Sequence, residues 1–368
     1  MSIPFVDLKT QYRALQEDID SRIRGVLEHG QYIMGPEVGE LEQKLAKFTG
    51  SRHCITVASG TEALLISLLS LDPSPGDEVI TTPFSFAATA EVIVLLGLRP
   101  VFVDIEPDTC NINTDLIHAK LSSRTRAIIP VSLYGQPADM DDINALAQRH
   151  GGITVIEDAA QSFGALYKGR RSGNLSAIGC TSFFPSKPLG CYGDGGAIFT
   201  NDDAIAQACR ELRVHGQSKR YLHTRVGVGG RMDTLQCAIV LSKLQRFEWE
   251  LQKRAEIGAK YNQSLDRHGI QRVQQRPDRN SVFAQYTILA SDRERLAVQL
   301  KQIGIPTAVH YPLPLNEQPA YSHLCCPDCT PEAQAVARRV LSLPMSADLG
   351  DNDQLRIIEA LVQFGQQA

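Results

Sequence analysis

The stretch Ile153–Ser162, ITVIEDAAQS, is the clearest indication of the fold. Its β-branched run is too short and too apolar for an exposed helix, so it predicts a buried strand that ends in acidic and amide residues. In open parallel α/β sheets, ligands bind outside the carboxyl ends of the strands, and Asp158 stands at such an end. Alternatively, Asp158 caps a helix that follows the strand, and Gln161 is a solvent-facing amide.

The pattern around this stretch predicts a mostly parallel sheet. Between Ser51 and Thr200, short β-branched segments alternate with helical ones, which is typical of βαβ units. The expected strands cover 54–58, 78–81, 100–104, 126–131, 153–157 and 179–184, and residues 197–200 are expected to pair back as a further strand. The predicted fold class is therefore α/β.

Segments outside this region predict further helices and a second domain. Residues 6–45 predict an amphipathic helix with a Gly/Pro loop, and residues 234–265 predict a long helix that joins two domains. The last third predicts a smaller α+β domain, with strands at 286–289 and 308–310 and a helix at 331–341. We expect a large domain over 1–245 and a small C-terminal domain over 246–368.

A second stretch, Thr181–Gly196 (TSFFPSKPLGCYGDGG), places one lysine among aromatic, proline and glycine residues. Lys187 follows a strand-like segment and precedes the apolar run at 197–200. Burial there would lower the pKa of its amine and make it a usable nucleophile, as a Schiff-base lysine requires. The alternative is a surface turn that happens to contain a lysine.

A third stretch favours a phosphate group. The strand-like segment 54–58 is followed by Ser59-Gly60-Thr61 and an apolar helical run, and free N–H groups at such a helix start attract anions. Gly60 permits close approach, and Thr61 and Ser182 would offer hydroxyls. Ser-Gly-Thr is also an ordinary capping sequence. A carboxylate at Asp158 would keep a pyridine nitrogen protonated, so the three stretches together predict pyridoxal phosphate chemistry.

Bulk properties narrow the function classes. The chain has 368 residues and a net charge of −4 without long runs of one sign, which argues against a nucleic-acid footprint. No apolar run is long enough for a spanning helix, and no secretory signal is seen, so we expect a cytoplasmic protein. Nine cysteines, an odd number, suggest reduced thiols. His323 with the cysteines at 325, 326 and 329 is too poor a ligand set to predict zinc, and we expect no metal.

The motifs in their order resemble the DegT/DnrJ/EryC1/StrS sugar aminotransferases. The order is Ser59-Gly60-Thr61, the FAAT stretch at 86–89, EDAAQ at 157–161, and the lysine stretch at 182–196. The resemblance extends from about residue 5 to residue 345. It implies the type I aspartate aminotransferase fold and pyridoxal 5′-phosphate as cofactor. The dehydratase branch of the family has histidine where Lys187 stands, so lysine favours transamination.

The resemblance also implies roles for single residues. Lys187 would form the Schiff base and carry the proton, and Asp158 would hold the pyridine nitrogen. Gln161 would touch the ring hydroxyl and Phe86 would stack on the ring, while the phosphate would be held by Gly60, Thr61 and Ser182. The sugar would be bound by Arg231, His310, Tyr311, Gln31 and Tyr32.

The lysine stretch and PTAVHYP at 306–312 are most similar to the branch that aminates C3 of UDP-2-acetamido-2-deoxy-3-oxo-D-glucuronate in O-antigen sugar synthesis. That similarity implies a UDP-linked keto sugar as substrate, L-glutamate as amino donor and 2-oxoglutarate as its product. It also implies a homodimer with shared active sites. Three alternatives stay open: a 4-keto nucleotide sugar, another pyridoxal phosphate reaction such as dehydration or decarboxylation, and a non-catalytic cofactor-binding regulator.

One position departs from the family pattern. The family usually has Gly-x-Asn-x-Arg before the helix that starts near residue 234, and the Asn reaches the cofactor phosphate of the other subunit. Here the segment is Gly227-Val228-Gly229-Gly230-Arg231, so Gly229 occupies the Asn position. The side-chain contact is therefore lost, and we expect a weaker phosphate site unless another group replaces it.

Overall fold

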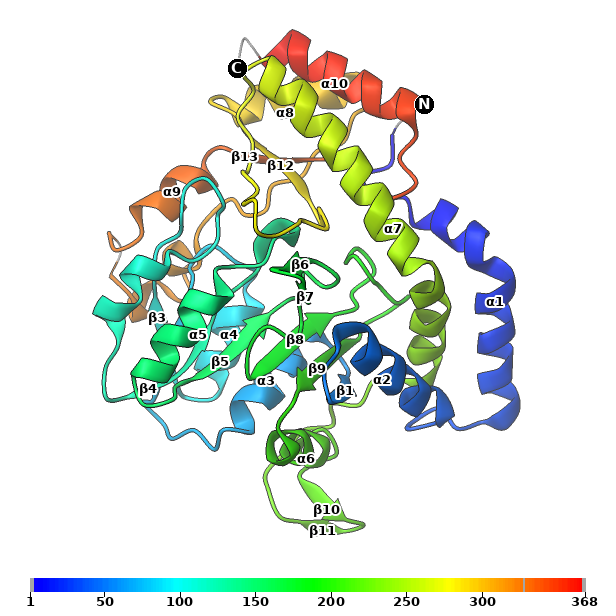
Figure 1. Cartoon of the computed structure of the whole chain (residues 1–368), viewed down its shortest axis with the longest axis vertical. Coiled ribbons are helices and arrows are strands. Elements are labelled where there is room, and N and C mark those ends of the chain that lie inside the picture. The colour runs from blue at the N-terminus through cyan, green and yellow to red at the C-terminus, as the bar shows by residue number, and fades with distance from the viewer. Residues whose placement is uncertain (1–2, 327, 366–368) are drawn as a thin grey trace.

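A seven-stranded sheet forms the centre of the larger lobe (Figure 1). The structure is a computed structural model, and it describes residues 3–326 and 328–365. Within these residues the strand order is β1-β9-β8-β5-β4-β2-β3. The strands are β1 (His53–Val57), β2 (Glu78–Thr81), β3 (Arg99–Phe102), β4 (Thr125–Ile129), β5 (Thr154–Asp158), β8 (Ile178–Ser182) and β9 (Gly196–Thr200).

The sheet is mostly parallel, as the alternation predicts. The β3–β2, β2–β4, β4–β5 and β5–β8 pairs are parallel. The strand β9 is antiparallel to both β1 and β8, so the expected return of residues 197–200 into the sheet is confirmed. The predicted strands of this region all form, with ends shifted by at most two residues. Parallel neighbours align their carboxyl ends, which gathers the ends of β4, β5 and β8 at one edge.

Helices cover the sheet because each carries an apolar face. The helix α3 (Gly60–Leu69) packs on β8 and β9, and its buried Leu64, Ile66 and Leu68 belong to the largest core cluster. The other helices of this lobe are α1 (Leu8–His29), α2 (Pro36–Thr49), α4 (Ala88–Leu95), α5 (Met140–Arg149) and α6 (Asp203–Leu212). Gly30 ends α1 in a left-handed conformation with φ 70°, where a side chain would be strained.

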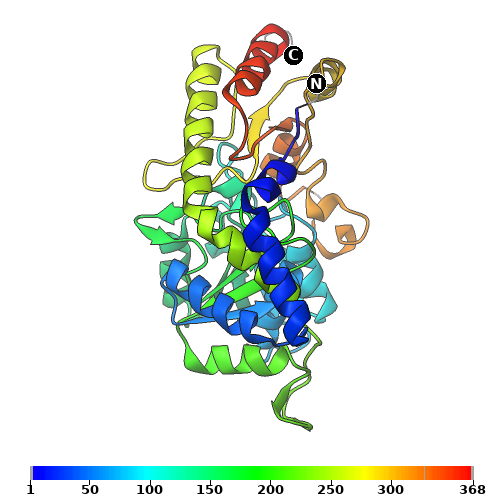
Figure 2. The same cartoon turned by 90° about the vertical axis from the view of Figure 1, so that its right-hand side faces the viewer.

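The helix α7 (Thr234–Arg267) runs from this lobe into a second core. Figures 1 and 2 show it beside α1 and then reaching up to the helices at the top of the molecule. Its C-terminal part buries Ile257, Tyr261 and Leu265 in a core with β12 (Tyr286–Leu289), β13 (Val340–Leu343), α8 (Arg293–Gln302) and α10 (Asp351–Gly365). Ile3 from the N-terminal segment packs in the same core. The boundary proposed at 245 falls inside α7 and stays a prediction.

Two predictions for the last third are wrong. Residues 308–310 do not form a strand, because only Ala308 pairs, through a single bridge to Ser342. Prolines at 306, 312 and 314 remove backbone donors on both sides. The helix expected at 331–341 ends at Ala337 (α9, Pro331–Ala337), since residues 340–343 are fully buried and pair with β12 as β13.

The remaining elements are short. They are the hairpins β6 (Leu166–Tyr167) with β7 (Arg170–Arg171) and β10 (Gln217–Lys219) with β11 (Leu222–His223), and the 3₁₀ turns η1 (Thr114–Leu116), η2 (His118–Lys120), η3 (Leu133–Gly135), η4 (Leu315–Glu317) and η5 (Ser322–Leu324). The β10–β11 hairpin projects from the body below α6 (Figures 1 and 2).

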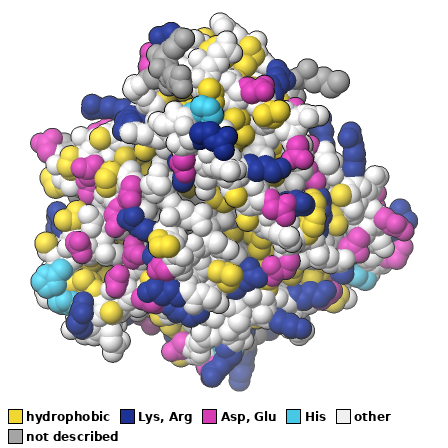
Figure 3. Space-filling view, turned by 45° about the horizontal axis from the view of Figure 1, so that its top comes forward, with side chains coloured by type: hydrophobic (Ala, Val, Ile, Leu, Met, Phe, Trp, Pro, Cys, Tyr) yellow, Lys and Arg dark blue, Asp and Glu magenta, His cyan; other side chains and the backbone are white. Residues whose placement is uncertain are grey.

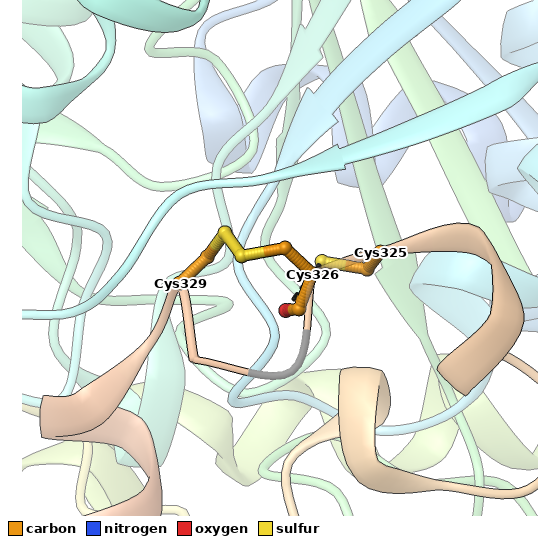
Figure 4. Close-up of a disulfide and its surroundings, with 3 residues drawn as sticks. All are labelled: Cys325, Cys326 and Cys329. Carbon is orange, nitrogen blue, oxygen red and sulfur yellow. Dashed lines mark hydrogen bonds between the residues drawn. A yellow bond between two sulfur atoms is a disulfide. The ribbon is translucent and has the colours of Figure 1, made fainter.

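The cysteines do not all remain thiols. Cys326 and Cys329 form a disulfide, which Figure 4 shows beside the free Cys325. The expectation of reduced thiols is therefore wrong for this pair. The Cα atoms of these two cysteines are 5.6 Å apart, a separation that a disulfide can span. The other cysteines, most of them buried, are free.

Two properties of the whole fold bear on function. Among residues 3–326 and 328–365, no helix has the length and apolar character needed to cross a membrane, and no three potential metal ligands converge on one point. On the face shown in Figure 3, basic and acidic side chains are interspersed rather than gathered by sign. Binding to a large polyanion would need a field of one sign, and this face does not supply it.

Candidate active site

Asp158 ends β5 at the carboxyl edge of the sheet. Its Oδ1 accepts the N–H of Ala160 at 3.1 Å and its Oδ2 accepts the hydroxyl of Thr89 at 3.1 Å. Burial raises the pKa of this carboxyl, and the nearby Lys187 partly opposes that effect. A turn rather than a helix follows, so Asp158 is not a helix cap. A buried carboxylate with two neutral donors is well suited to a cationic partner.

Lys187 lies in the loop between β8 and β9, partly buried. The backbone N–H of Lys187 donates to the carbonyl of Phe184 at 2.9 Å and closes a turn that follows β8. Burial lowers the pKa of its side-chain amine, and the Asp158 carboxylate opposes this shift. The paired strands β5 and β8 thus bring the predicted lysine and carboxylate within electrostatic reach of each other.

Gln161 is fixed in one orientation. Its Oε1 accepts the N–H of Tyr134 at 2.8 Å, and its Nε2 donates to the hydroxyl oxygen of Tyr311 at 3.2 Å. Because a backbone N–H can only donate, the amide oxygen must face Tyr134. The proton of the Tyr311 hydroxyl therefore remains available to another acceptor.

Aromatic rings gather beside this amide. The Tyr311 ring centroid lies 6.4 Å from that of Phe84 and 6.3 Å from that of Phe86. Phe84 is buried, whereas Phe86 is 57% exposed. The exposed Phe86 ring beside Tyr311 offers a flat apolar surface for a planar ligand.

Gly60 and Ser182 touch across the sheet edge. A Cβ at Gly60 would stand 2.6 Å from the Cβ of Ser182, so only glycine fits there. Ser59 caps α3 by accepting the N–H of Glu62 at 3.1 Å, and the helix begins directly at Gly60 and Thr61. The start of α3 therefore lies beside the hydroxyl of Ser182 at the end of β8, and the sequence pattern placed these residues together.

His310 and Tyr311 approach from the second core. The Nδ1 of His310 lies 3.0 Å from the hydroxyl oxygen of Ser342, and the hydroxyl of Tyr134 bonds to the His310 carbonyl. Burial and the nearby Lys187 both lower the pKa of the His310 imidazole. The structure thus brings Lys187, Asp158, Gln161, Phe86, His310 and Tyr311 to one place.

Comparison with known proteins agrees with this geometry. Residues 13–362 match the model of the DegT/DnrJ/EryC1/StrS aminotransferase family. The chain belongs to this family.

One curated relative is the UDP-2-acetamido-2-deoxy-3-oxo-D-glucuronate aminotransferase of Pseudomonas aeruginosa, with 54% identity over 97% of this chain and 98% of that protein. The solved structure of S. venezuelae DesV with a ketimine intermediate has a TM-score of 0.97 at 36% identity, over 100% of this chain and 99% of that one. NtdA from Bacillus subtilis with bound PMP has a TM-score of 0.91 at 28% identity, over 100% and 86%. The predicted type I fold and pyridoxal-phosphate-dependent aminotransferase activity are confirmed at the level of the family.

The departure from the DegT/DnrJ/EryC1/StrS pattern at Gly229 has a local cause. A Cβ there would lie 3.0 Å from Cε1 and 3.2 Å from Nε2 of His215. The His215 ring therefore occupies the space that a longer side chain at 229 would need. An imidazole, which can donate a hydrogen bond, stands where the sequence indicates only a lost contact.

The other expected sugar contacts of this family member lie apart from Lys187. Tyr32 accepts the N–H of Thr234 through its carbonyl, so the exposed Gln31 and Tyr32 lie against the start of α7. Arg231 lies just before that helix, and its buried Nε has no hydrogen-bond partner within the described residues. No hydrogen bond or ring contact in the described part of the chain joins these three residues to the Lys187 cluster.

Sequence reasoning missed several residues of the site. Thr89 binds Asp158 directly, and its place in the FAAT stretch at 86–89 was the available signal. Tyr134, Thr287 and Ser342 carry no sequence signal, because they come from three distant segments that meet only in the fold.

Proposed function

We propose that this aminotransferase converts UDP-2-acetamido-2-deoxy-3-oxo-D-glucuronate to the 3-amino sugar, with L-glutamate as donor. The observation that carries the proposal is the convergence of a pKa-lowered Lys187 and a buried Asp158 in a chain 54% identical to an enzyme of that name. The proposed setting is cytoplasmic synthesis of O-antigen sugars.

The residues present fit pyridoxal phosphate. Asp158 is a buried carboxylate whose hydrogen-bond partners are neutral. A protonated pyridine nitrogen would favour the charged carboxylate and so oppose the rise in pKa that burial causes. Phe86 offers an exposed ring face, and Gly60 lets the start of α3 lie against Ser182, where the hydroxyls of Thr61 and Ser182 would hold a phosphate. When bound, the cofactor supplies an electron sink for the transfer of an amino group.

The chain's own residues then divide the work. Lys187, with a lowered pKa, holds an unprotonated amine more readily than a surface lysine, so it can attack a carbonyl and afterwards accept and return a proton. Asp158 would hold the ring nitrogen of the cofactor and keep it protonated. The Oε1 of Gln161 accepts from Tyr134, and its Nε2 carries two protons. One of these protons is donated to Tyr311, so the other remains to be donated to a ligand.

The substrate side is proposed on the basis of charge and free donors. A hexuronate carries a carboxylate, and the planar guanidinium of Arg231 suits it. The free hydroxyl proton of Tyr311 is a second donor. His310, Gln31 and Tyr32 are proposed to contact the sugar.

A homodimer is part of the proposal. Tyr32, Ile33 and Met34 are 49%, 50% and 44% exposed in one loop, an apolar surface that a second copy would cover. The same loop carries two of the proposed sugar contacts and pairs with Asp233 near Arg231. If a second copy of the chain packed against this loop, the proposed sugar contacts would lie at the interface between the two copies, which supports shared active sites.

The first test is the absorption spectrum of the purified protein before and after addition of L-glutamate. We expect a yellow band that bleaches, followed by recovery when the 3-keto sugar is added and by detection of the 3-amino sugar by mass spectrometry. Bleaching that is reversed only by 4-keto nucleotide sugars would overturn the assignment of the carbon. A band that no donor changes would support the regulator.

A further inference from the structure

A buried amine on α7 lies outside the site described above. Lys243 is 1% exposed, and among the described residues its Nζ has no hydrogen-bond partner. The Nζ stands 4.3 Å from the ring centroid of Tyr192. A buried ammonium without hydrogen bonds is costly, and the negative face of an aromatic ring offsets part of that cost. The Tyr192 ring therefore stabilises the charged form of Lys243.

The same helix also holds the backbone of Tyr192. The N–H of Tyr192 donates to Oε1 of Gln236 at 2.9 Å, and Gln236 stands seven residues before Lys243. Seven residues make about two turns of an α-helix, so both side chains lie on one face of α7. The ring of Tyr12 in α1 meets the Tyr192 ring edge-on at 6.2 Å between centroids. Helix side chains thus contact Tyr192 at both its backbone and its ring.

Tyr192 belongs to the loop that carries Lys187. Phe183 closes the base of this loop, because its N–H donates to the carbonyl of Gly195 and its carbonyl accepts the N–H of Cys191, each at 2.7 Å. Four residues separate Lys187 from Tyr192. A displacement of Tyr192 is therefore transmitted to Lys187 over a short stretch of backbone within a closed loop.

The groups around Lys243 leave it charged near neutral pH. Burial lowers the pKa of Lys243 to about 8, and Glu250 and Cys191 oppose the shift. Burial raises the pKa of Cys191 to about 11 and that of Tyr192 to about 12, so Lys243 loses its proton before either of them as the pH rises. The titratable and charged groups that face Lys243 or these neighbours are Cys191, Tyr192 and Asp194 in the loop, Tyr12 and Asp20 in α1, Arg246, Glu250 and Arg254 in α7, and Asp348.

We propose that charged Lys243 holds Tyr192 against α7 and so positions the loop that carries Lys187. Lys243 and Tyr192 are positioning residues, since they act through this loop. The attraction between the amine and the ring lasts only while the amine is charged. When Lys243 loses its proton, the Gln236 bond remains and the loop loosens. The consequence for Lys187 rests on the proposed function, whereas the contact between Lys243 and Tyr192 does not.

The contact is tested by hydrogen exchange and mass spectrometry on the peptide 188–195 of the cofactor-free protein. At pH 7 we expect exchange, corrected for the intrinsic rate, to be about threefold to tenfold faster in Lys243→Met and in Tyr192→Leu than in the wild type. The double variant should be no faster than either single one, because both remove the same contact. Tyr192→Phe keeps the ring and should match the wild type, as should Lys253→Met, which removes a half-exposed lysine of the same helix paired with Glu256.

A change of pH gives the same test without a substitution. Raising the pH to 9 should bring the wild type to the corrected exchange rate of Lys243→Met, whose own corrected rate should stay constant. Exchange as slow as in the wild type for Lys243→Met at pH 7 would overturn the inference. So would effects of Lys243→Met and Tyr192→Leu that multiply in the double variant.

The burial of the amine has a readout of its own. An unfolded lysine has a pKa of about 10.4, so between about pH 8 and that value the unfolded chain binds more protons than the folded one, and stability rises with pH. The denaturant midpoint of the wild type should therefore rise relative to that of Lys243→Met as the pH increases from 7 to 10. A constant difference would place the amine in water and overturn the inference.

The effect on Lys187 is measured in the same cofactor-free proteins. Reductive trapping with pyridoxal 5′-phosphate and borohydride, followed by peptide mapping, gives the rate at which Lys187 reacts. The wild type should be trapped about threefold to tenfold faster than Lys243→Met at pH 7, and the ratio should approach one by pH 9. A ratio of one at pH 7 would overturn the positioning of Lys187. If Lys187 is not trapped even in the wild type, its proposed role fails, while the exchange rates still decide the contact between Lys243 and Tyr192.

Discussion

The two halves of the site are held by different means. Asp158 ends β5, where backbone pairing sets its position (register Asp158↔Cys180), and Lys187 follows β8 in a turn that its backbone N–H closes on the carbonyl of Phe184. His310 and Tyr311 lie in a segment anchored by one bridge, Ala308↔Ser342, and otherwise by side-chain hydrogen bonds. Backbone pairing tolerates most side-chain changes, whereas a network of hydroxyls loses its geometry when one member is removed. We therefore expect the chemical half to be robust in shape and the recognition half to be adjustable.

The largest effect is expected from Lys187→Ala. Because no other amine stands opposite Asp158 among the described residues, the variant should lose the yellow band and at least about a thousandfold in turnover. The spectrum and a glutamate half-reaction measure both. Lys168→Ala, which removes a half-exposed lysine paired with Asp141, is the matched control and should behave as wild type. A yellow Lys187→Ala protein would show that the backbone-held half does not carry the chemistry.

Asp158→Asn should come next. The amide keeps an oxygen for the Ala160 N–H but cannot hold a positive ring nitrogen. Turnover should fall by about 100-fold to 10,000-fold, the range typical of a proton-holding group. The melting temperature should not fall, since a buried charge has been removed. Single-turnover rates and calorimetry would measure this, and unchanged rates would contradict the role.

Gly60→Ala should have a moderate effect. Its Cβ would stand 2.6 Å from that of Ser182, so folding should weaken by about 1–3 kcal/mol and cofactor retention should drop. Gly39→Ala is the control, because a Cβ in that helix meets nothing within 4 Å and should stabilise by about 0.5–1 kcal/mol. Denaturant titration and cofactor dialysis distinguish them. If the two variants had equal stability and equal cofactor retention, the structure around Ser182 would be able to shift and accommodate the added methyl group.

The smallest effect is expected from Tyr311→Phe. The change removes the acceptor of the Gln161 Nε2 proton and a free donor, while the aromatic contacts stay. The loss should be about 0.5–1.5 kcal/mol, or less than about tenfold in kcat/KM. Steady-state kinetics measure it. A larger loss than in Asp158→Asn would reverse the comparison between the two halves.

The sheet-borne half could be predicted from sequence because its signals are local. A β-branched run that ends in Glu157-Asp158 and a lysine between proline and glycine residues each lie within a few positions of the strand that carries them. The prediction for 308–310 failed because the partner of Ala308 is Ser342, and flanking prolines prevent more than one bridge. The hydroxyls of Tyr134, Thr287 and Ser342 are ordinary in sequence, and only the packing of two cores brings them together.

The continuity of α7 has a mechanical consequence. One helix buries Val240 and Leu241 beneath the sheet and Tyr261 and Leu265 in the second core, with no break from 234 to 267. The two cores therefore share one continuous helix, and a force that tilts one core is transmitted through this helix to the other. Heating should melt both in a single transition, and a chain cut at 245 should leave two fragments that each expose half of a buried helix.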